Sequence, residues 1–169
     1  MTSALNTTPG RVAIRPARPA DIELVLQFVR ELAIYEKLEQ DVVATAGDFA
    51  AALFGPQPRV FCDIAECDGD PAGFALWFYS FSTFRGRHGL YLEDLFVRPD
   101  FRRHGIGKAL LRTLAHRCVV EGLPRLEWAV LDWNTPAIAF YRSQGASLQD
   151  DWTTCRLTGD ALADLGRAG

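Results

Sequence analysis

Apolar residues recur along this chain with two different periods. In some segments they return every three or four positions, which is the spacing of one face of a helix. In others they form short continuous or alternating runs rich in aromatic and branched side chains, which indicate strands. The predicted helices cover residues 21–37, 45–54, 105–121 and 135–144, and the predicted strands cover residues 12–15, 60–66, 72–81, 90–97, 126–130 and 152–157, with a short helix after the last strand.

Turn and capping residues support these boundaries. Thr45 and Asp48 have the spacing of a capping pair at a helix start. Asp68-Gly69 between two apolar runs is typical of a tight hairpin. Pro136 falls in the first turn of its helix and Gly145 lies just past the end, which are the preferred positions of these two residue types.

The order of the elements indicates the fold class. A strand and two helices are followed by three strands joined by short turns, which predicts an antiparallel meander, and then helix, strand, helix and strand. We find no internal repeat, linker or low-complexity tract. The chain therefore predicts one α/β domain over residues 12–169, with a mixed and mostly antiparallel sheet of about six or seven strands flanked by helices. Residues 1–11 are expected to form a flexible tail.

Composition excludes several classes of partner. About half of the 169 residues are hydrophobic and the formal net charge is −3. No run of Lys and Arg indicates a nucleic-acid surface. No apolar run reaches the length of a membrane span, and residues 1–11 lack the apolar centre of a signal peptide. We expect a cytoplasmic protein with no nucleic-acid or membrane partner.

The cysteines and histidines do not form a metal-binding pattern. No two cysteines have the C-x-x-C spacing and no H-E-x-x-H is present, so we expect buried, reduced thiols and no metal. The residues concerned are Cys62, Cys67, Cys118, Cys155, His88, His104 and His116.

A glycine-containing loop precedes the 105–121 helix. Gly105 and Gly107 would let backbone N–H groups approach an anion, and the helix N-terminus adds positive potential. A P-loop does not fit, because it needs Gly in place of Arg102 and Ser or Thr in place of Ala109. A dinucleotide fingerprint does not fit either, since its third glycine would fall at Leu110. A phosphate-binding loop and a plain helix start both remain open from these residues.

The loop resembles a known family. R-x-x-G-x-G, here Arg102, Gly105 and Gly107, is similar to the pyrophosphate loop of GNAT acetyltransferases, and it follows the strand and proline turn Leu95–Pro99 as in that family. The resemblance extends from about Arg15 to Leu157. The segments that resemble the diamine and thialysine acetyltransferase branch are Glu31–Leu38, Tyr91–Val97, Val130–Asn134, Ala139–Tyr141 and Gly145-Ala146.

The resemblance implies the GNAT fold and transfer of an acetyl group from acetyl-CoA to a primary amine of a small cationic molecule. In the family, a bulge opens the strand before the loop and admits the pantetheine arm of the cofactor. The family also implies a homodimer, which the aromatic residues of 77–84 and Trp152 favour. The cofactor-binding residues that it implies are Leu95, Phe96, Val97, Arg102, Arg103, His104, Gly105, Ile106, Gly107, Lys108, Asn134, Thr135, Pro136, Ala137 and Tyr141.

Acetyl transfer needs a base and an acid. A lysine-like amine has a pKa of about 10.4, so forming its neutral state at pH 7 costs roughly 4–5 kcal/mol. Glu93 is the candidate base. In a regular strand it would point away from Asp94, so the two share one pocket only if the strand bulges there. From its position alone, Glu93 could also be a surface carboxylate.

Tyr141 is the candidate acid. It shares a helix face with Asn134 and Ile138. The resemblance implies that Tyr141 protonates the departing CoA thiolate, whereas an ordinary helical tyrosine would be a packing residue. Asn134 has the position of a helix cap, and the resemblance adds a hydrogen bond to the pantetheine arm.

The resemblance also implies an amine site of carboxylates and aromatic rings, which suit an ammonium ligand. The residues of this implied amine site are Tyr35, Glu36, Glu93, Asp94, Glu127, Trp128 and Asp151. The chain before Trp152 is shorter than in the family, so the part of the amine site at Asp151 differs from the family's pattern. Two alternatives stay open: an acetyltransferase of peptides or proteins, and a non-catalytic module that binds acyl-CoA.

Overall fold

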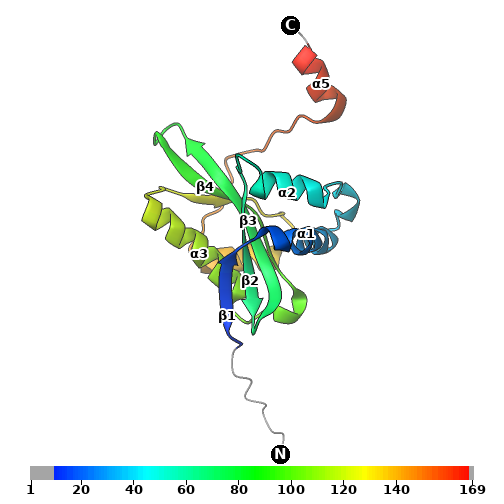
Figure 1. The fold of residues 1–169 in the computed structure, drawn as a ribbon. Helices are drawn as coiled ribbons and strands as arrows, with labels where there is room; N and C mark the ends of the chain where they lie inside the picture. The colour runs from blue at the N-terminus through cyan, green and yellow to red at the C-terminus, as the bar shows by residue number, and fades with distance from the viewer. Residues whose placement is uncertain (1–9, 168–169) are drawn as a thin grey trace, which may run out of the picture. The chain divides into compact units, whose positions relative to one another are not determined.

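The structure is a computed structural model that describes residues 10–167 (Figure 1). The described residues form two compact units, divided between residues 129 and 130, and each is described by itself. Residues 1–9, most of the predicted tail, lie outside the described residues. The prediction of one domain over residues 12–169 stays a prediction.

One five-stranded sheet forms the centre of the first unit. Neighbouring strands are antiparallel except for the last pair, which is parallel. The predicted meander is therefore confirmed. The strands, which lie in the sheet in chain order, are β1 (Val12–Pro16), β2 (Phe61–Cys67), β3 (Asp70–Ser82), β4 (Arg87–Val97) and β5 (Leu126–Trp128).

The strand count is lower than predicted. Residues 152–157 form no strand, and every residue of this segment is exposed. A strand needs a buried face or a hydrogen-bonded neighbour to be stable, and this segment buries neither face. Cys155 lies in this segment and is a free thiol exposed to solvent, although it was expected to be buried. The other three cysteines, Cys62, Cys67 and Cys118, are buried free thiols, as expected.

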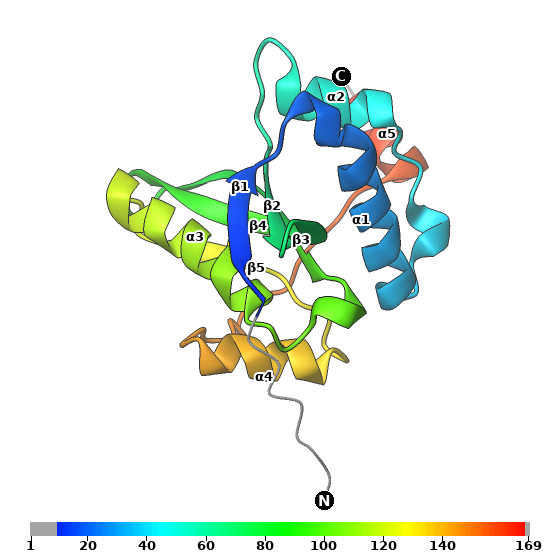
Figure 2. The same ribbon diagram turned by 60° about the horizontal axis from the view of Figure 1, so that its bottom comes forward.

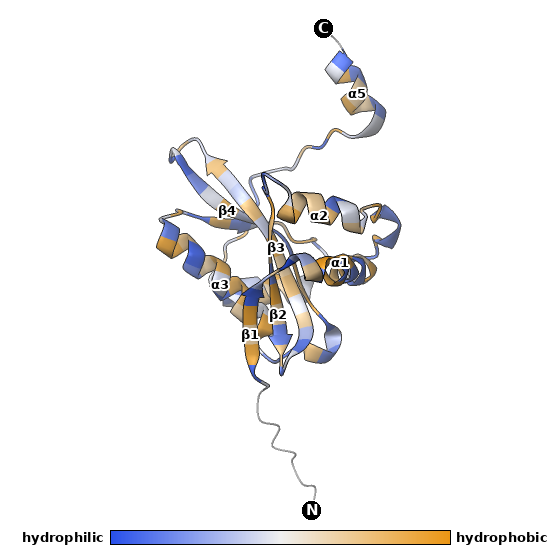
Figure 3. Ribbon diagram, viewed as in Figure 1, coloured by the Kyte–Doolittle hydropathy of each residue, from blue (hydrophilic) through white to orange (hydrophobic). Residues whose placement is uncertain are grey.

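Helices cover both faces of the sheet in the first unit. Figure 2 shows α3 on one face, with α1 and α2 on the other. Figure 3 shows hydrophobic and hydrophilic residues interspersed along α1 and α3, as expected for helices that each bury one side. The helices are α1 (Ile22–Glu36), α2 (Ala46–Phe54), α3 (Ile106–Glu121), α4 (Thr135–Ser143) and α5 (Gly159–Arg167), the last two in the second unit. No helix among residues 10–167 has the length and apolar character that crossing a membrane requires.

The core of the first unit has two parts, one on each face. On the α1 side, the ring of Phe28 stacks on Phe74 with centroids 5.4 Å apart, and Phe96 packs edge-on against Phe28. On the α3 side, Leu90 and Leu92 of β4 are at most 1% exposed. β4 therefore contributes side chains to both parts of the core, and any irregularity in it changes which side chains reach each face.

The hairpin turn and the helix cap that the sequence predicted are both present. Asp68 and Gly69 have φ angles of 53° and 93°, which are the left-handed values of a two-residue type I′ hairpin. Thr45 and Asp48 form the predicted capping box, since Thr45 Oγ1 accepts from Asp48 N and Asp48 Oδ2 accepts from Thr45 N. Both features depend on a few neighbouring residues, and for that reason the sequence is sufficient to predict them.

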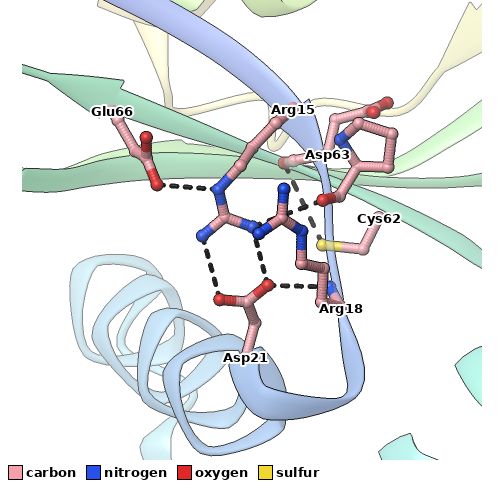
Figure 4. Close-up of polar contacts among 7 residues, drawn as sticks. Arg15, Arg18, Asp21, Cys62, Asp63 and Glu66 are labelled. Carbon is pink, nitrogen blue, oxygen red and sulfur yellow. Dashed lines mark hydrogen bonds and ion pairs between the residues drawn. The ribbon is translucent and has the colours of Figure 1, made fainter. Parts of the chain in front are cut away.

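An ion-pair network holds the start of α1 against the sheet (Figure 4). The guanidinium of Arg15 on β1 donates to Glu66 on β2 at 2.7 Å and to both oxygens of Asp21 at 2.7 and 2.9 Å. Asp21 Oδ2 also accepts from the backbone N–H of Arg18. The Arg15 guanidinium lowers the pKa of Asp21. The network fixes one end of α1, whose other end carries Tyr35 and Glu36.

Candidate active site

The strand β4 carries a bulge at Glu93. Leu92 pairs with Trp77 and Asp94 pairs with Leu76, so Glu93 is an extra residue with no counterpart on β3. The bulge that the family resemblance implied is therefore present, and it falls within the segment of the predicted base.

The bulge changes the direction of the following side chains. Because Trp77 and Leu76 are consecutive in β3, their partners Leu92 and Asp94 lie on opposite faces. Leu92 faces α3, while Asp94 is on the face covered by α1, together with Phe96. Simple alternation would have placed Leu92 and Asp94 on the same face.

Three carboxylates gather on this side of the sheet, and we name them the acidic cluster: Glu36, Glu93 and Asp94. Burial, followed by the negative charges of Glu93 and Glu36, raises the pKa of Asp94 to about 7. Burial also raises the pKa of Glu36. Glu93 itself is exposed. The bulge and the last turn of α1 thus create a partly desolvated site of high negative charge.

Two aromatic residues adjoin the acidic cluster. Burial raises the pKa of Tyr91, and the charges of Glu93 and Glu127 raise it further. Tyr35 precedes Glu36 on α1, and the guanidinium of Arg102 lies 4.8 Å from the centre of its ring. The structure therefore brings Tyr35 into contact with the glycine loop that follows β4.

The parallel pairing of β4 with β5 places Glu127 and Trp128, both predicted for the amine site, on opposite faces of the sheet. Glu127 pairs with Tyr91 and lies on the same face, where it forms an ion pair with Arg125 at 2.7 Å. Trp128 pairs with Leu92 and therefore lies on the α3 face. The structure brings Glu127 toward the acidic cluster but does not bring Trp128 there.

The edge of β4 beyond the bulge has no strand partner on the β5 side within the described residues. β5 pairs only with Leu90, Tyr91 and Leu92. On that side, the backbone groups of Leu95, Phe96 and Val97 are therefore not paired with another strand, and the Val97 carbonyl accepts from Arg102 Nε at 3.1 Å. An extended ligand arm could pair with them.

The glycine loop has a backbone suited to an anion. Arg103 and Gly105 have φ angles of 68° and 75°, and Gly105 is the N-cap of α3. Glycine has no side chain to accept hydrogen bonds from the first N–H groups of the helix. A Cβ built on Gly105 meets no atom within 4 Å, so the space in front of it is open. Arg103, His104 and Lys108 beside it are exposed.

The remaining predicted residues belong to the second unit. Asn134 is buried and caps α4, because its Oδ1 accepts from Ala137 N at 3.3 Å. Tyr141 is 8% exposed. Gly145, with φ of 92°, ends the helix, as predicted. Thr135, Pro136 and Ala137 form the first turn of α4, whereas Asp151 lies in an exposed turn after it.

Arg98 lies just after β4 and was not among the predicted residues. Its guanidinium donates to both oxygens of Glu31 at 2.8 Å and to the carbonyl of Pro71 at 2.9 Å, and it lies 4.7 Å from the centre of the Phe28 ring. It thereby fastens the end of β4 to α1. Glu31 and Arg98 are 67 residues apart, and no local pattern connects them.

Comparisons with known proteins identify the family. A profile of the Acetyltransferase (GNAT) family matches residues 24–146. The chain belongs to the GNAT acetyltransferase family. The predictions of the family and of an enzyme are confirmed. Among the residues described, no group of three or more His, Cys, Asp or Glu side chains is placed to hold a metal ion.

Several characterised or solved relatives of this GNAT enzyme are similar over most of its length. The L-ornithine N5-acetyltransferase of Arabidopsis thaliana is 33% identical and is matched over 91% of this chain and 87% of its own. The thialysine N-epsilon-acetyltransferase of Bos taurus is 36% identical, over 91% and 96%. An integron cassette protein from the mobile metagenome of Vibrio cholerae has a TM-score of 0.77 at 30% identity, over 93% and 98%. The predicted GNAT fold is confirmed.

Proposed function

We propose that this GNAT enzyme transfers the acetyl group of acetyl-CoA to a primary amine of a small cationic metabolite. The acceptor is a diamine, a polyamine or an amino acid that resembles thialysine. The observation that carries the proposal is the acidic cluster at the β4 bulge. The relatives named above act on ornithine and thialysine, which are both amino acids with an amine at the end of the side chain.

The electrostatics of the acidic cluster favour a cationic acceptor. Glu36, Glu93 and Asp94 repel one another, and burial adds to the cost of charging Asp94. A bound ammonium group would offset both effects, because an opposite charge within a few ångströms stabilises the ionised carboxyl. Tyr35 and Tyr91 would supply ring faces beside the cation. We include Glu127 among the acceptor-binding residues and assign lower weight to Trp128 and Asp151.

The same carboxylates would prepare the amine for reaction. One proton passes from the ammonium group to the carboxylate of Glu93. The pKa of the neighbouring Asp94 is raised to about 7, which is closer to the pKa of an amine than the pKa of an ordinary carboxyl is. The neutral nitrogen attacks the thioester carbonyl carbon, the C–N bond forms and the C–S bond breaks. Tyr141 gives its proton to the departing thiolate, and the second proton that the nitrogen loses on becoming an amide restores the Tyr141 hydroxyl.

Acetyl-CoA fits the features of the loop and strand. The uncapped start of α3 with Gly105, Gly107 and Arg103 supports pyrophosphate binding. The open edge of β4 supports binding of the pantetheine arm along Leu95–Val97. Asn134 and the first turn of α4 are proposed to contact the same arm. We also propose a cytoplasmic location, in keeping with the free thiols.

Changing Gly105 to Asp is expected to weaken CoA binding by tenfold to a hundredfold, since a carboxylate would then face the pyrophosphate. Calorimetry with CoA measures the effect. Gly105→Ala introduces a side chain at the same positive φ without the charge, and Gly86→Asp introduces the charge at an exposed glycine with φ of 59° in the β3–β4 turn. Gly107→Asp should weaken CoA binding as well. Unchanged CoA affinity in both Gly105→Asp and Gly107→Asp would show that CoA does not bind at this loop.

We also propose that the enzyme is a homodimer. The family resemblance and the exposed aromatic side chains Phe81, Phe84 and Trp152 support this assembly. Light scattering at micromolar concentration is expected to give twice the mass of one chain. A single-chain mass under those conditions would show that the protein is a monomer.

A further inference from the structure

A cavity of about 160 Å³ lies in the first unit at residues that play no part in the proposed acetyl transfer. It is bounded by the end of β1, the end of α2, the strands β2 and β3, and Arg117 of α3. We name it the Trp77 cavity. Its volume is close to that of a cavity of about 150 Å³ that holds benzene, so a ligand of a few carbon atoms fits.

One part of the Trp77 cavity is apolar. The ring of Phe61 stacks on Trp77 with centroids 4.6 Å apart, and Tyr79 packs edge-on against both. Leu53 and Phe54 at the end of α2 also line the cavity. These surfaces suit a short hydrocarbon group.

A buried carboxylate forms a second part. Asp63 is 4% exposed, and its Oδ2 accepts from the indole N–H of Trp77 at 2.9 Å. Burial raises the pKa of Asp63, whereas the Trp77 hydrogen bond and the charge of Arg117 lower it. Among the described residues no ion pair to Asp63 is formed. A ligand with a positive group would therefore complete its electrostatic environment.

Arg117 supplies an unused donor. Its guanidinium lies 4.7 Å from the centre of the Trp77 ring, and its Nη1 pairs with Glu121 at 3.1 Å. Its Nε is buried and makes no hydrogen bond of good geometry, while the hydroxyl of Tyr79 lies within hydrogen-bonding reach of the Arg117 side chain. Buried donors are nearly always satisfied by protein, water or ligand. Two groups of opposite charge thus flank one indole ring without pairing with each other.

We propose that the Trp77 cavity binds a small zwitterionic α-amino acid with an apolar side chain. The ammonium group binds Asp63, the carboxylate accepts from Arg117 Nε, and the side chain lies among Leu53, Phe54 and Phe61. The rim is accessible, since Tyr79 is 38% exposed and the Arg117 side chain 34%. The site shares no residue with the acidic cluster.

Calorimetry on the full-length protein without acetyl-CoA tests the ligand class. L-Leucine is expected to bind to one saturable site with a Kd of about 1 mM or tighter. L-Leucinamide lacks the carboxylate and isocaproate lacks the ammonium, so each should bind at least tenfold more weakly. Equal binding of leucine and leucinamide, or no saturable leucine binding up to about 10 mM, would overturn the proposal, and water alone would then satisfy Arg117.

Variants locate the site. Arg117→Gln should weaken leucine binding at least tenfold, whereas Arg112→Gln, at an exposed position of the same helix, should not change it. Asp63→Asn keeps an acceptor for Trp77 and should weaken binding similarly; if this variant does not fold, Arg117→Gln decides. Asp94→Asn should leave leucine binding intact. Leucine binding that survives Arg117→Gln and is lost in Asp94→Asn would assign it to the acidic cluster and overturn the inference.

Discussion

Replacing Tyr141 with Phe is expected to lower kcat by about 10²–10⁴-fold, the usual contribution of a general acid, while leaving the affinity for acetyl-CoA nearly unchanged. The physical reason is that the thiolate of CoA then leaves without the phenolic proton. The fold should persist, because the change removes one hydroxyl from a ring that is already buried. Steady-state kinetics across pH measure the effect, and the alkaline limb of the rate profile should flatten.

Tyr79→Phe is the matched control, since it removes a hydroxyl that donates to Glu121 in the first unit. It should retain wild-type turnover. A Tyr141→Phe enzyme with wild-type kcat would make water or another group the acid and Tyr141 a packing residue. Loss of CoA affinity with kcat unchanged would make its hydroxyl a cofactor anchor.

Replacing Asp94 with Asn is expected to lower kcat/KM for the amine by about 10²–10³-fold, because the site loses its most buried charge. The wild-type rate should rise with pH as Asp94 ionises with a pKa of about 7, and the variant should lack this rise. The measurement is kcat/KM for the amine between pH 5 and 9. Asp70→Asn, at an exposed position of β3, should behave like wild type.

Asp94→Asn is expected to lower activity but to raise the thermal stability of the folded protein above neutral pH. The pKa of Asp94 is raised in the folded state, so its neutral form contributes stability below the unfolded pKa of about 4. That contribution is lost as pH rises through about 7. Asp94→Asn should therefore unfold at a higher temperature than wild type at pH 8 and at a similar temperature near pH 4. A variant that is less stable at pH 8 would contradict the raised pKa.

The sequence was sufficient for features that depend on neighbouring residues. The Thr45 cap, the Asp68-Gly69 hairpin and the end of α4 at Gly145 each need only a few adjacent side chains and a defined φ angle. The family resemblance supplied the bulge in β4. Strand alternation alone could not have placed it, because one extra residue reverses the face of every side chain that follows.

Features that depend on distant residues could not be predicted. The ion pair of Arg98 with Glu31 joins β4 to α1 through residues with no sequence relationship. The family resemblance implied both Glu127 and Trp128 as amine-site residues, but adjacent residues of a strand point to opposite faces. The segment 152–157 has apolar residues typical of a strand, yet it remains exposed and unpaired within the described part of the chain.

Transfer of an acetyl group to a small cationic amine can be measured as CoA release from acetyl-CoA with a panel of acceptors. The panel contains ornithine, thialysine, a diamine, spermidine and peptides with a free N-terminus or lysine, and mass spectrometry identifies the product. We expect at least one small cationic amine to yield equal amounts of CoA and mono-acetylated amine, at a rate well above that of every peptide. Turnover confined to peptides, or CoA binding with no turnover of any acceptor, would contradict this expectation.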